Sequence, residues 1–157
     1  MPAIRAEQIN PFLMSAKQVL QQVCQIDVQI GPISKDNFSV SGEPLFIMLG
    51  ITGEISGQVC IVMDEECAKD IASRMMMGMP VSSIDDMAKS ALSELGNMMM
   101  GNAATILSNN NIRIDITPPT LLVGSATLTS PDISIIKVPL LYQNFDLKLC
   151  FLLKLAK

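Results

Sequence analysis

The stretch that decides the fold of this chain runs from Val81 to Asn110 and reads VSSIDDMAKSALSELGNMMMGNAATILSNN. Its apolar residues recur with the period of an α-helix, so the stretch predicts one long amphipathic helix. Ser83 is a favourable N-cap, and Asp86 supplies the acidic partner of a capping box. We expect the asparagines at 109–111 to end the helix.

A helical wheel of this segment separates apolar side chains from a polar row. When Glu94 is set at zero and each residue turns by about 100°, an apolar face spans about 60° to 180°. Its members are Ala88, Ala91, Leu92, Leu95, Met99, Ala103 and Ile106. One side of the helix is therefore expected to pack in the core, and the other side presents a Ser-x-x-x-Glu-x-x-Asn row. This polar row, between about 300° and 360°, consists of Ser90, Glu94, Asn97 and Gly101.

Two glycines lie beside the polar residues. Gly96 and Gly101 each cost about 1 kcal/mol relative to alanine inside a helix, which indicates that something must approach the backbone closely. The carboxylate of Glu94 could pair with a lysine of a partner, and the carboxamide of Asn97 could hold a water molecule. A solvated helix face explains the same residues without any partner, so the pattern alone leaves both interpretations open.

Composition favours a single globular domain over residues 1–157. An apolar content of 49% against 17% charged residues predicts a well-filled core. A net charge of −4, without a cluster of lysine or arginine, argues against nucleic-acid binding. No apolar run approaches the ~20 residues of a membrane span, and Arg5, Glu7 and Lys17 argue against a signal peptide. We therefore expect a cytoplasmic protein that binds neither nucleic acid nor membrane.

The inventory of reactive residues narrows the possible chemistry. The chain contains no histidine, which removes serine–histidine and cysteine–histidine nucleophilic systems and most zinc sites. The acids at 64–66 are explained by a helix start, and the glycines at 50, 53 and 57 by turns and strand edges, so we predict neither a metal site nor a phosphate loop. Without a C-x-x-C pair, the cysteines predict reduced, buried thiols. They are Cys24, Cys60, Cys67 and Cys150.

The rest of the chain predicts two further helices and several strands. A helix is expected over 7–23, with Asn10 as its cap and Pro11 in its first turn. A second helix would follow Asp64 and end with Gly78 at the C′ position. The order of one helix, three strands, two helices and three or four strands indicates an α+β layer structure. The strands are expected at 26–30, 44–51, 55–63, 112–116, 120–126, 133–142 and 145–155, with a loop or weak edge strand over 34–43.

Methionine is unusually frequent, at 12 residues. Met99 lies on the apolar face of the long helix and fits a role in filling the core. Met98 and Met100 lie off that face, so they could flank a docking surface, where methionine adapts to a partner. Asn102 falls near the apolar face, where it would need hydrogen-bond partners, and we expect it to tie a neighbouring loop.

The polar row, together with a proline further along the chain, resembles the signature of the CheC/CheX/FliY phosphatases, which dephosphorylate the chemotaxis response regulator CheY. The row reads Ser90-x-x-x-Glu94-x-x-Asn97, and the proline is Pro118 or Pro119. The segment GNMMMGNAATILS that follows the glutamate also looks like the helix of this family. Only one such helix is visible, so the chain is most similar to CheX, whose protomer carries one motif, rather than to CheC, which carries two.

This resemblance implies a hydrolase of two-component signalling. Asn97 would orient the water that attacks the aspartyl phosphate of a CheY-like receiver domain. Glu94 would pair with a lysine in the active site of that receiver and so fix how the helix enters. Both residues are expected to be catalytic. The expected partner-binding residues are Ser90, Met98, Gly101 and Pro119.

The resemblance also implies an α+β fold with the long helices on one face of an antiparallel or mixed sheet, and a homodimer formed through sheet edges. We expect no cofactor or metal on this chain, because the magnesium ion of the reaction would belong to the receiver. One alternative is a non-catalytic receiver-binding module like the middle domain of the flagellar switch protein FliM. Another is a cytosolic dimeric domain of unrelated purpose. The presence of both Glu94 and Asn97 favours the enzyme, whereas a polar row covered by another element would favour the last alternative.

Overall fold

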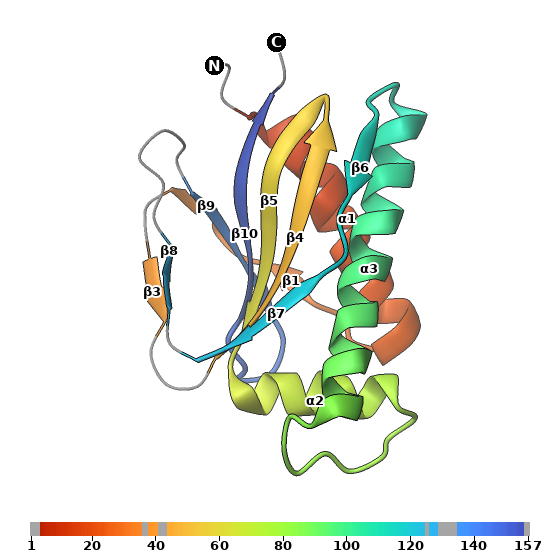
Figure 1. Ribbon diagram of the computed structural model, residues 1–157, viewed down its shortest axis with the longest axis vertical. Coiled ribbons are helices and arrows are strands. Elements are labelled where there is room, and N and C mark those ends of the chain that lie inside the picture. Colours follow the sequence, from red (N-terminus) through yellow and green to blue (C-terminus); the bar gives the residue numbers. More distant parts are fainter. Residues whose placement is uncertain (1–3, 36–37, 41–43, 125, 129–134, 156–157) are drawn as a thin grey trace.

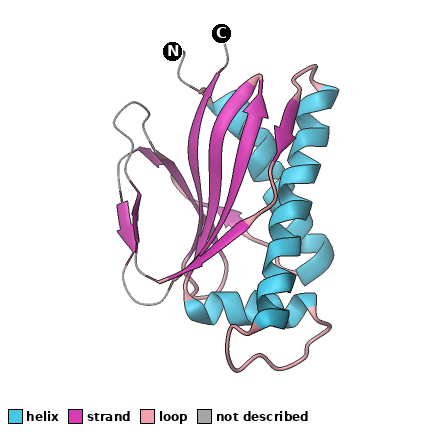
Figure 2. Ribbon diagram, in the orientation of Figure 1, coloured by secondary structure: helices cyan, strands magenta, loops and turns pink. Residues whose placement is uncertain are grey.

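Three helices pack on one face of an antiparallel sheet in the computed structural model, which describes residues 4–35, 38–40, 44–124, 126–128 and 135–155. Figure 1 shows α1 and α3 along this face, with α2 crossing near one end of the strands. The division into a helical layer and a strand layer is clearest in Figure 2. The predicted α+β fold, with its helices on one face of the sheet, is therefore confirmed. The helices are α1 (Ala6–Cys24), α2 (Glu65–Met75) and α3 (Asp86–Asn109).

The main sheet has eight strands in the order β1-β9-β10-β5-β4-β6, with β2 also paired to β9 and β7 also paired to β4. Every strand pair in it is antiparallel. Each edge therefore consists of two short strands in line. β3 and β8 form a separate pair, which Figure 1 shows on the side of the sheet away from α3. The strands are β1 (Gln29–Ile30), β2 (Ser34–Lys35), β3 (Phe38–Val40), β4 (Leu45–Gly53), β5 (Ile55–Met63), β6 (Ile114–Ile116), β7 (Thr120–Val123), β8 (Ala126–Leu128), β9 (Ile136–Leu141) and β10 (Leu147–Leu155).

The inner face of α3 is the apolar face that the helical wheel predicted. Burial of each leucine on this face contributes about 1.5–3 kcal/mol to the stability of the fold. Ala91 and Ile106, which the wheel placed on the same face, are only half-buried. The fully buried residues of the helix include Ala88, Leu92, Leu95, Met99, Ala103 and Leu107.

The two glycines of α3 have different surroundings. A Cβ atom added at Gly96 would lie 2.9 Å from Cγ2 of Ile47 and 3.4 Å from Cδ1 of Leu49, both on β4. The close approach that the sequence predicted is therefore confirmed at Gly96, and the sheet itself is what approaches. A Cβ atom added at Gly101 would meet no atom within 4 Å among the described residues.

This difference predicts that replacement by alanine has different effects on stability at the two glycines of α3. We expect Gly101→Ala to raise the free energy of unfolding by up to about 1 kcal/mol, because alanine favours the helix and has room there. Gly96→Ala should be less stable than Gly101→Ala by about 1–3 kcal/mol, because its methyl group overpacks the contact with β4. Urea unfolding of both variants and the wild type measures the difference. Equal stability of the two variants would contradict this account of the contact.

The start of α3 differs from the prediction by a small shift. The N-cap is Asp85 rather than Ser83, and its carboxylate accepts a hydrogen bond of 2.9 Å from the backbone N–H of Ala88. Aspartate and serine cap helices about equally well, so their spacing alone could not decide between them. The end is as predicted, with Asn110 as the C-cap and Asn111 in the left-handed region at φ 64°.

The first helix begins earlier than predicted. Arg5 is its N-cap, and the backbone N–H of Arg5 donates to Oε1 of Gln8 at 2.8 Å. Asn10 is therefore not a cap, and Pro11 lies inside the helix instead of in its first turn. A proline there removes one backbone hydrogen bond. The buried face of α1, which includes Phe12 at 0% exposure, offsets that loss.

The second helix begins as predicted and ends slightly before the predicted residue. Asp64 caps it by accepting a hydrogen bond of 2.8 Å from the backbone N–H of Cys67. Met77 takes the left-handed conformation after the C-cap, at φ 61°. Gly78, predicted at C′, therefore lies one residue further on, at C″, and its N–H donates to the carbonyl of Ser73 at 2.8 Å. This is the bond pattern of a Schellman ending.

The predicted hairpins are confirmed, and the strands at the sheet edges are shorter than expected. Within 26–30 only Gln29 and Ile30 pair as a strand, because their partner β9 ends opposite Gln29. Ile26 and Val28 are nevertheless buried, as their alternation indicated. The predicted strand at 112–116 is reduced to β6 and the one at 120–126 to β7, while 34–43 contains the short strands β2 and β3. Residues 36–37, 41–43, 125 and 133–134 of the predicted segments lie outside the described residues.

All four cysteines are free and buried, as the sequence predicted. Burial raises the pKa of Cys24 to about 11 and the pKa of both Cys67 and Cys150 to about 12. Burial raises the pKa of Cys60 as well. These thiols remain protonated at neutral pH, which makes them weak nucleophiles.

The raised thiol pKa values predict a loss of stability in alkali. Above 9.0, the ordinary value of a cysteine thiol, the unfolded chain loses these protons while the folded chain keeps them up to about 11 at Cys24. We therefore expect the free energy of unfolding to be level near neutral pH and then to fall. The slope is about 1.4 kcal/mol per pH unit for each such thiol. Urea unfolding across neutral and alkaline pH measures it, and Cys24→Ala should show a shallower slope. A stability that stays level above pH 9.0 would contradict the prediction.

Candidate functional site

The polar row lies on the outer face of α3. Ser90, Glu94 and Asn97 are exposed, and Gly101 is half-buried. Within the part of the chain that the structure describes, the side chains of Glu94 and Asn97 form no hydrogen bond or ion pair. An exposed carboxylate and an exposed carboxamide are therefore held on a fixed helix without partners of their own. A polar row covered by another element would have favoured a domain of unrelated purpose. The row is instead exposed, so this alternative loses its support.

An exposed apolar residue, which the sequence analysis did not single out, lies beside the start of the polar row. Met87 lies at about 20° on the wheel, one turn of helix before Ser90, and is 59% exposed. Its position in line with Glu94 was available from the periodicity of the segment. The helix contains several other methionines, so Met87 did not stand out in the sequence. Its large exposed fraction is what the structure adds.

The other methionines of α3 are more buried than the wheel indicated. Met100 is 0% exposed, so the prediction that it flanks a docking surface is wrong. Met98 is half-buried and packs against the core with part of its surface. The helix packs against α1, α2 and three strands of the sheet, β4, β6 and β7, so its buried arc is wider than one face. Only the exposed part of Met98 remains available to a partner.

Asn102 connects two helices rather than a helix and a loop. Its Nδ2 donates a hydrogen bond of 2.9 Å to Oε1 of Gln18 on α1. Nearby, the buried hydroxyl of Ser15 on α1 donates to the backbone carbonyl of Met99. The structural role predicted for Asn102 is therefore confirmed, with α1 in place of the expected loop. These two bonds fasten α3 to α1, and Asn102 lies about 120° around the helix from the sheet contact at Gly96.

Both candidate prolines lie in the connection between β6 and β7, two strands that contact α3. Pro118 is exposed and Pro119 is half-buried. Thr117 anchors the start of this connection, because its Oγ1 accepts a hydrogen bond of 2.8 Å from the backbone N–H of Gly50. The proline segment is thus fixed to β4, near the helix that carries the polar row.

Beyond Gly101 the outer face of α3 leads into a hollow of about 610 Å³, which we call the charged hollow. Ala104 and Ser108 of α3 form one wall, and Glu54, Arg113 and Asp115 line the other. The backbone of Arg113 is paired with Glu54: its N–H donates to Oε2 of that residue at 2.6 Å, and its carbonyl accepts from the Glu54 N–H at 3.0 Å. The polar row therefore ends at a concave surface that carries both signs of charge.

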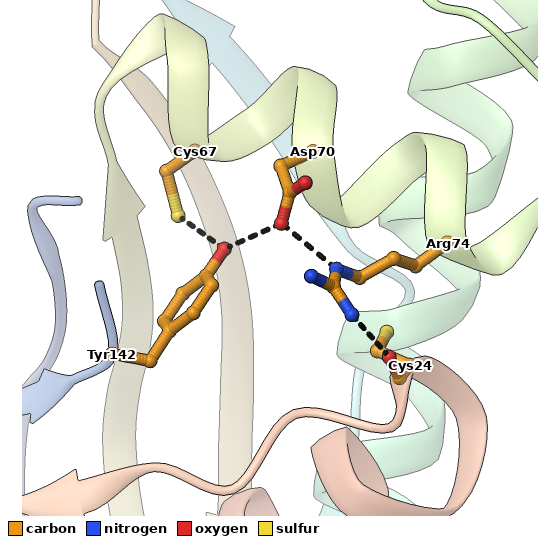
Figure 3. A network of polar contacts seen from close by, with 5 residues as sticks. All are labelled: Cys24, Cys67, Asp70, Arg74 and Tyr142. Atoms are coloured by element: carbon orange, nitrogen blue, oxygen red, sulfur yellow. Dashed lines mark hydrogen bonds and ion pairs between the residues drawn. The ribbon is translucent and has the colours of Figure 1, made fainter. Parts of the chain in front are cut away.

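A second group of polar side chains lies around α2, away from the polar row (Figure 3). The hydroxyl of Tyr142 donates to Asp70 at 3.3 Å and lies 3.4 Å from the sulfur of Cys67. Arg74 donates to Asp70 at 2.9 Å and to the carbonyl of Cys24 at 3.1 Å. Burial raises the pKa of Tyr142, so the phenol stays protonated. This network ties α2 to the end of α1 and to the turn after β9, and every labelled residue in it is already partnered.

The acids at the start of α2 are explained by the helix itself. Asp64 is the N-cap, and Lys69 lies 3.1 Å from Glu65 and 3.5 Å from Glu66. Among the residues that the structure describes, no three cysteine, aspartate or glutamate side chains lie close enough to hold a metal ion. No helix in the described ranges has an apolar stretch long enough to cross a membrane.

Solved structures place this fold in a known class. A CheC-like superfamily protein from Shewanella sp. PV-4 superposes with a TM-score of 0.82 at 25% identity, covering 96% of this chain and 99% of that chain. The CheX chain in the crystal structure of the CheX–CheY–BeF3–Mg²⁺ complex from Borrelia burgdorferi superposes with a TM-score of 0.74 at 25% identity, covering 96% and 99%. The fold is that of the CheC-like superfamily.

Sequence comparison is more specific. The family described as chemotaxis phosphatase CheX matches residues 45–139. The CheY-P phosphatase CheX of Thermotoga maritima is 32% identical over 144 residues, covering 90% of this chain and 93% of that protein. The chain belongs to the CheX family of chemotaxis phosphatases, as the polar row of α3 predicted.

Proposed function

We propose that the protein hydrolyses the aspartyl phosphate of a CheY-like receiver domain, with the outer face of α3 as the part that enters the receiver's active site. The observation that carries this proposal is the exposure of Glu94 and Asn97, without internal partners, on a helix whose other face is fully packed. Membership of the CheX family supports it, as does the complex of CheX with CheY from Borrelia burgdorferi.

Asn97 is the residue to which we assign the attacking water. An acyl phosphate is already reactive, so acceleration requires chiefly that a water molecule be held in line with the phosphorus atom. A carboxamide can accept a hydrogen bond from this water and donate another to a neighbouring oxygen. Asn97 points away from the core on a helix that is packed along its other side, so its reach into a partner is set by rigid structure.

Glu94 lies one helical turn from Asn97 and is the residue to which we assign docking. Its carboxylate would pair with a lysine in the receiver's active site, which fixes the register in which the helix enters. Such a charged hydrogen bond is strong and acts over a short distance, so it both attracts the receiver and fixes its position. Gly101, Ser90, Pro119 and the exposed part of Met98 would contact the receiver around this point. The magnesium ion that neutralises the phosphoryl group would be bound by the receiver, so this chain would need no cofactor.

The same family membership leads us to propose a cytoplasmic homodimer. Large apolar side chains are exposed at both edges of the main sheet. At one edge these are Ile30 on β1, at 40%, and Leu141 on β9, at 50%. At the other edge these are Leu122, at 46%, and Val123, at 47%, both on β7. Exposed sheet edges with apolar residues are commonly covered by another chain, which fits pairing of two protomers through an edge.

The test is the loss of phosphate from a phosphorylated receiver, with the wild type, Asn97→Ala and Glu94→Ala compared. We expect the wild type to accelerate hydrolysis, and Asn97→Ala to reduce that acceleration on the order of 100-fold, because the water is no longer held in place. Asn97→Ala should still bind the receiver. Glu94→Ala should weaken binding roughly 10- to 100-fold, because it removes a hydrogen bond between charged groups.

Lys89→Ala is a suitable matched control, since Lys89 is exposed on the same helix at about 220° on the wheel, away from the polar row. None of the variants should be less stable than the wild type, because the substituted side chains contact nothing in the core and alanine favours the helix. If the wild type binds the receiver and leaves the hydrolysis rate unchanged, the protein is a docking module and not a phosphatase. If Asn97→Ala loses binding together with activity, the water-positioning role is wrong.

A further inference from the structure

The polar row is too small to hold a receiver domain by itself. From Ser90 to Gly101 it forms a strip about 16 Å long, at 1.5 Å per residue, and about 10 Å wide. That is an area on the order of 160 Å², whereas a specific interface buries about 800 Å² on each partner. A receiver that takes the row must therefore cover neighbouring surface as well, and the surface at the two ends of the row is part of it.

The surface at the two ends of the row has different chemistry. At the start lies Met87, an apolar side chain that is 59% exposed. At the end lies the charged hollow, in which Glu54 is already engaged with the backbone N–H of Arg113. The side chain of Arg113 is exposed and has no hydrogen bond or ion pair to any other described residue. Its guanidinium group is thus the available cation at this end, with a planar set of donors that suits a carboxylate.

The distances suit a single partner. Ala104, at the near end of the charged hollow, lies about 15 Å along the helix from Glu94 and about 10 Å from Asn97, at 1.5 Å per residue. A domain of about 100 residues has a radius of gyration near 13 Å, so it is about 30 Å across. One receiver that places its active site over Glu94 and Asn97 can therefore reach the charged hollow at the same time.

The charges along this face also have an order. Asp85, Asp86 and Glu94 are acidic and lie at the start of α3 and in the row, while beyond its end the cation Arg113 lies in the charged hollow with Glu54 and Asp115. A partner that offers a lysine to Glu94 and a carboxylate to Arg113 fits in one direction only. Reversing it would bring like charges together at both points, which is a means of excluding wrong orientations and wrong partners.

We propose that the receiver docks along the whole outer face of α3, with an apolar contact at Met87 and an ion pair between Arg113 and a carboxylate on the receiver surface outside its phosphorylation site. This proposal rests on the proposed function, because it assumes that the receiver is the partner of the polar row. Arg113 here is a specificity-determining residue: it selects and orients the receiver, and it does not touch the reacting atoms.

The experiment is steady-state dephosphorylation of the receiver by the wild type, Arg113→Glu, Arg113→Gln and Met87→Ser. We expect Arg113→Glu to raise KM roughly tenfold, because a like charge replaces an attractive pair, while kcat stays unchanged. Arg113→Gln should raise KM by less, since it removes the attraction without adding repulsion. This variant keeps the test valid if the charge reversal disturbs the backbone pairing with Glu54. Met87→Ser should also raise KM alone. Added salt should raise the KM of the wild type more than that of Arg113→Gln, because ionic screening weakens the pair.

Lys89→Glu is the matched control. Lys89 is exposed on α3 at about 220° on the wheel, away from the polar row, and its substitution makes the same change of charge. If Lys89→Glu raises KM as much as Arg113→Glu, the effect is one of overall charge and the proposed pair is wrong. A fall in kcat for Arg113→Gln, or an unchanged KM for both Arg113 variants, would also overturn it. Failure of the wild type to accelerate hydrolysis would instead overturn the proposed function, so the two results are distinguishable.

Discussion

The contact between α3 and β4 at Gly96 sets the direction of everything on the outer face of the helix. The glycine backbone lies so close to the sheet that an added Cβ would be 2.9 Å from Ile47. Because successive residues turn by about 100°, a rotation of α3 by one position would carry Asn97 toward the sheet and Glu94 out of line. A helix with a bulkier residue at 96 would have to move outward or turn. The geometry of the polar row is thus decided on the buried side of the helix.

Two further contacts hold this orientation from the side of α1. The hydroxyl of Ser15 binds the carbonyl of Met99, and the amide of Asn102 binds Gln18. A helix fixed on two sides loses little conformational freedom when a partner binds, so binding is not weakened by the entropy of ordering it. For a reaction that depends on placing a water molecule, such rigidity is also the main requirement for rate. The interior of the domain and the proposed chemistry are therefore linked through a single helix.

Much of this arrangement could be predicted from the sequence because the periodicity of α3 is strong. The apolar face, the exposed row, the hairpins and the family all follow from local patterns in residues 81–110 and the strands around them. Local patterns could not decide between caps of equal quality, which is why Ser83 was expected where Asp85 is found. They also could not show that the buried arc of α3 is wide enough to include Met100.

The charged hollow is the feature that sequence reasoning was least able to find. It joins Glu54 in the turn between β4 and β5, Arg113 before β6, and the last turns of α3. These residues are brought together by the pairing of β6 with the end of β4, a long-range contact that no local motif encodes. In the same way, the glycines of α3 were equivalent in the sequence, and only packing shows that Gly96 serves the fold while Gly101 faces open space.

The central claim is that the outer face of α3 is the surface that meets the receiver. Amide hydrogen exchange of the protein, alone and with a receiver to which beryllofluoride is bound as a mimic of the phosphoryl group, tests this claim without altering either chain. The account predicts slower exchange in peptides from α3 and from residues 113–119, with α2 and the network around Tyr142 unchanged. Protection confined to α2, or to the edge formed by β1 and β2, would contradict it.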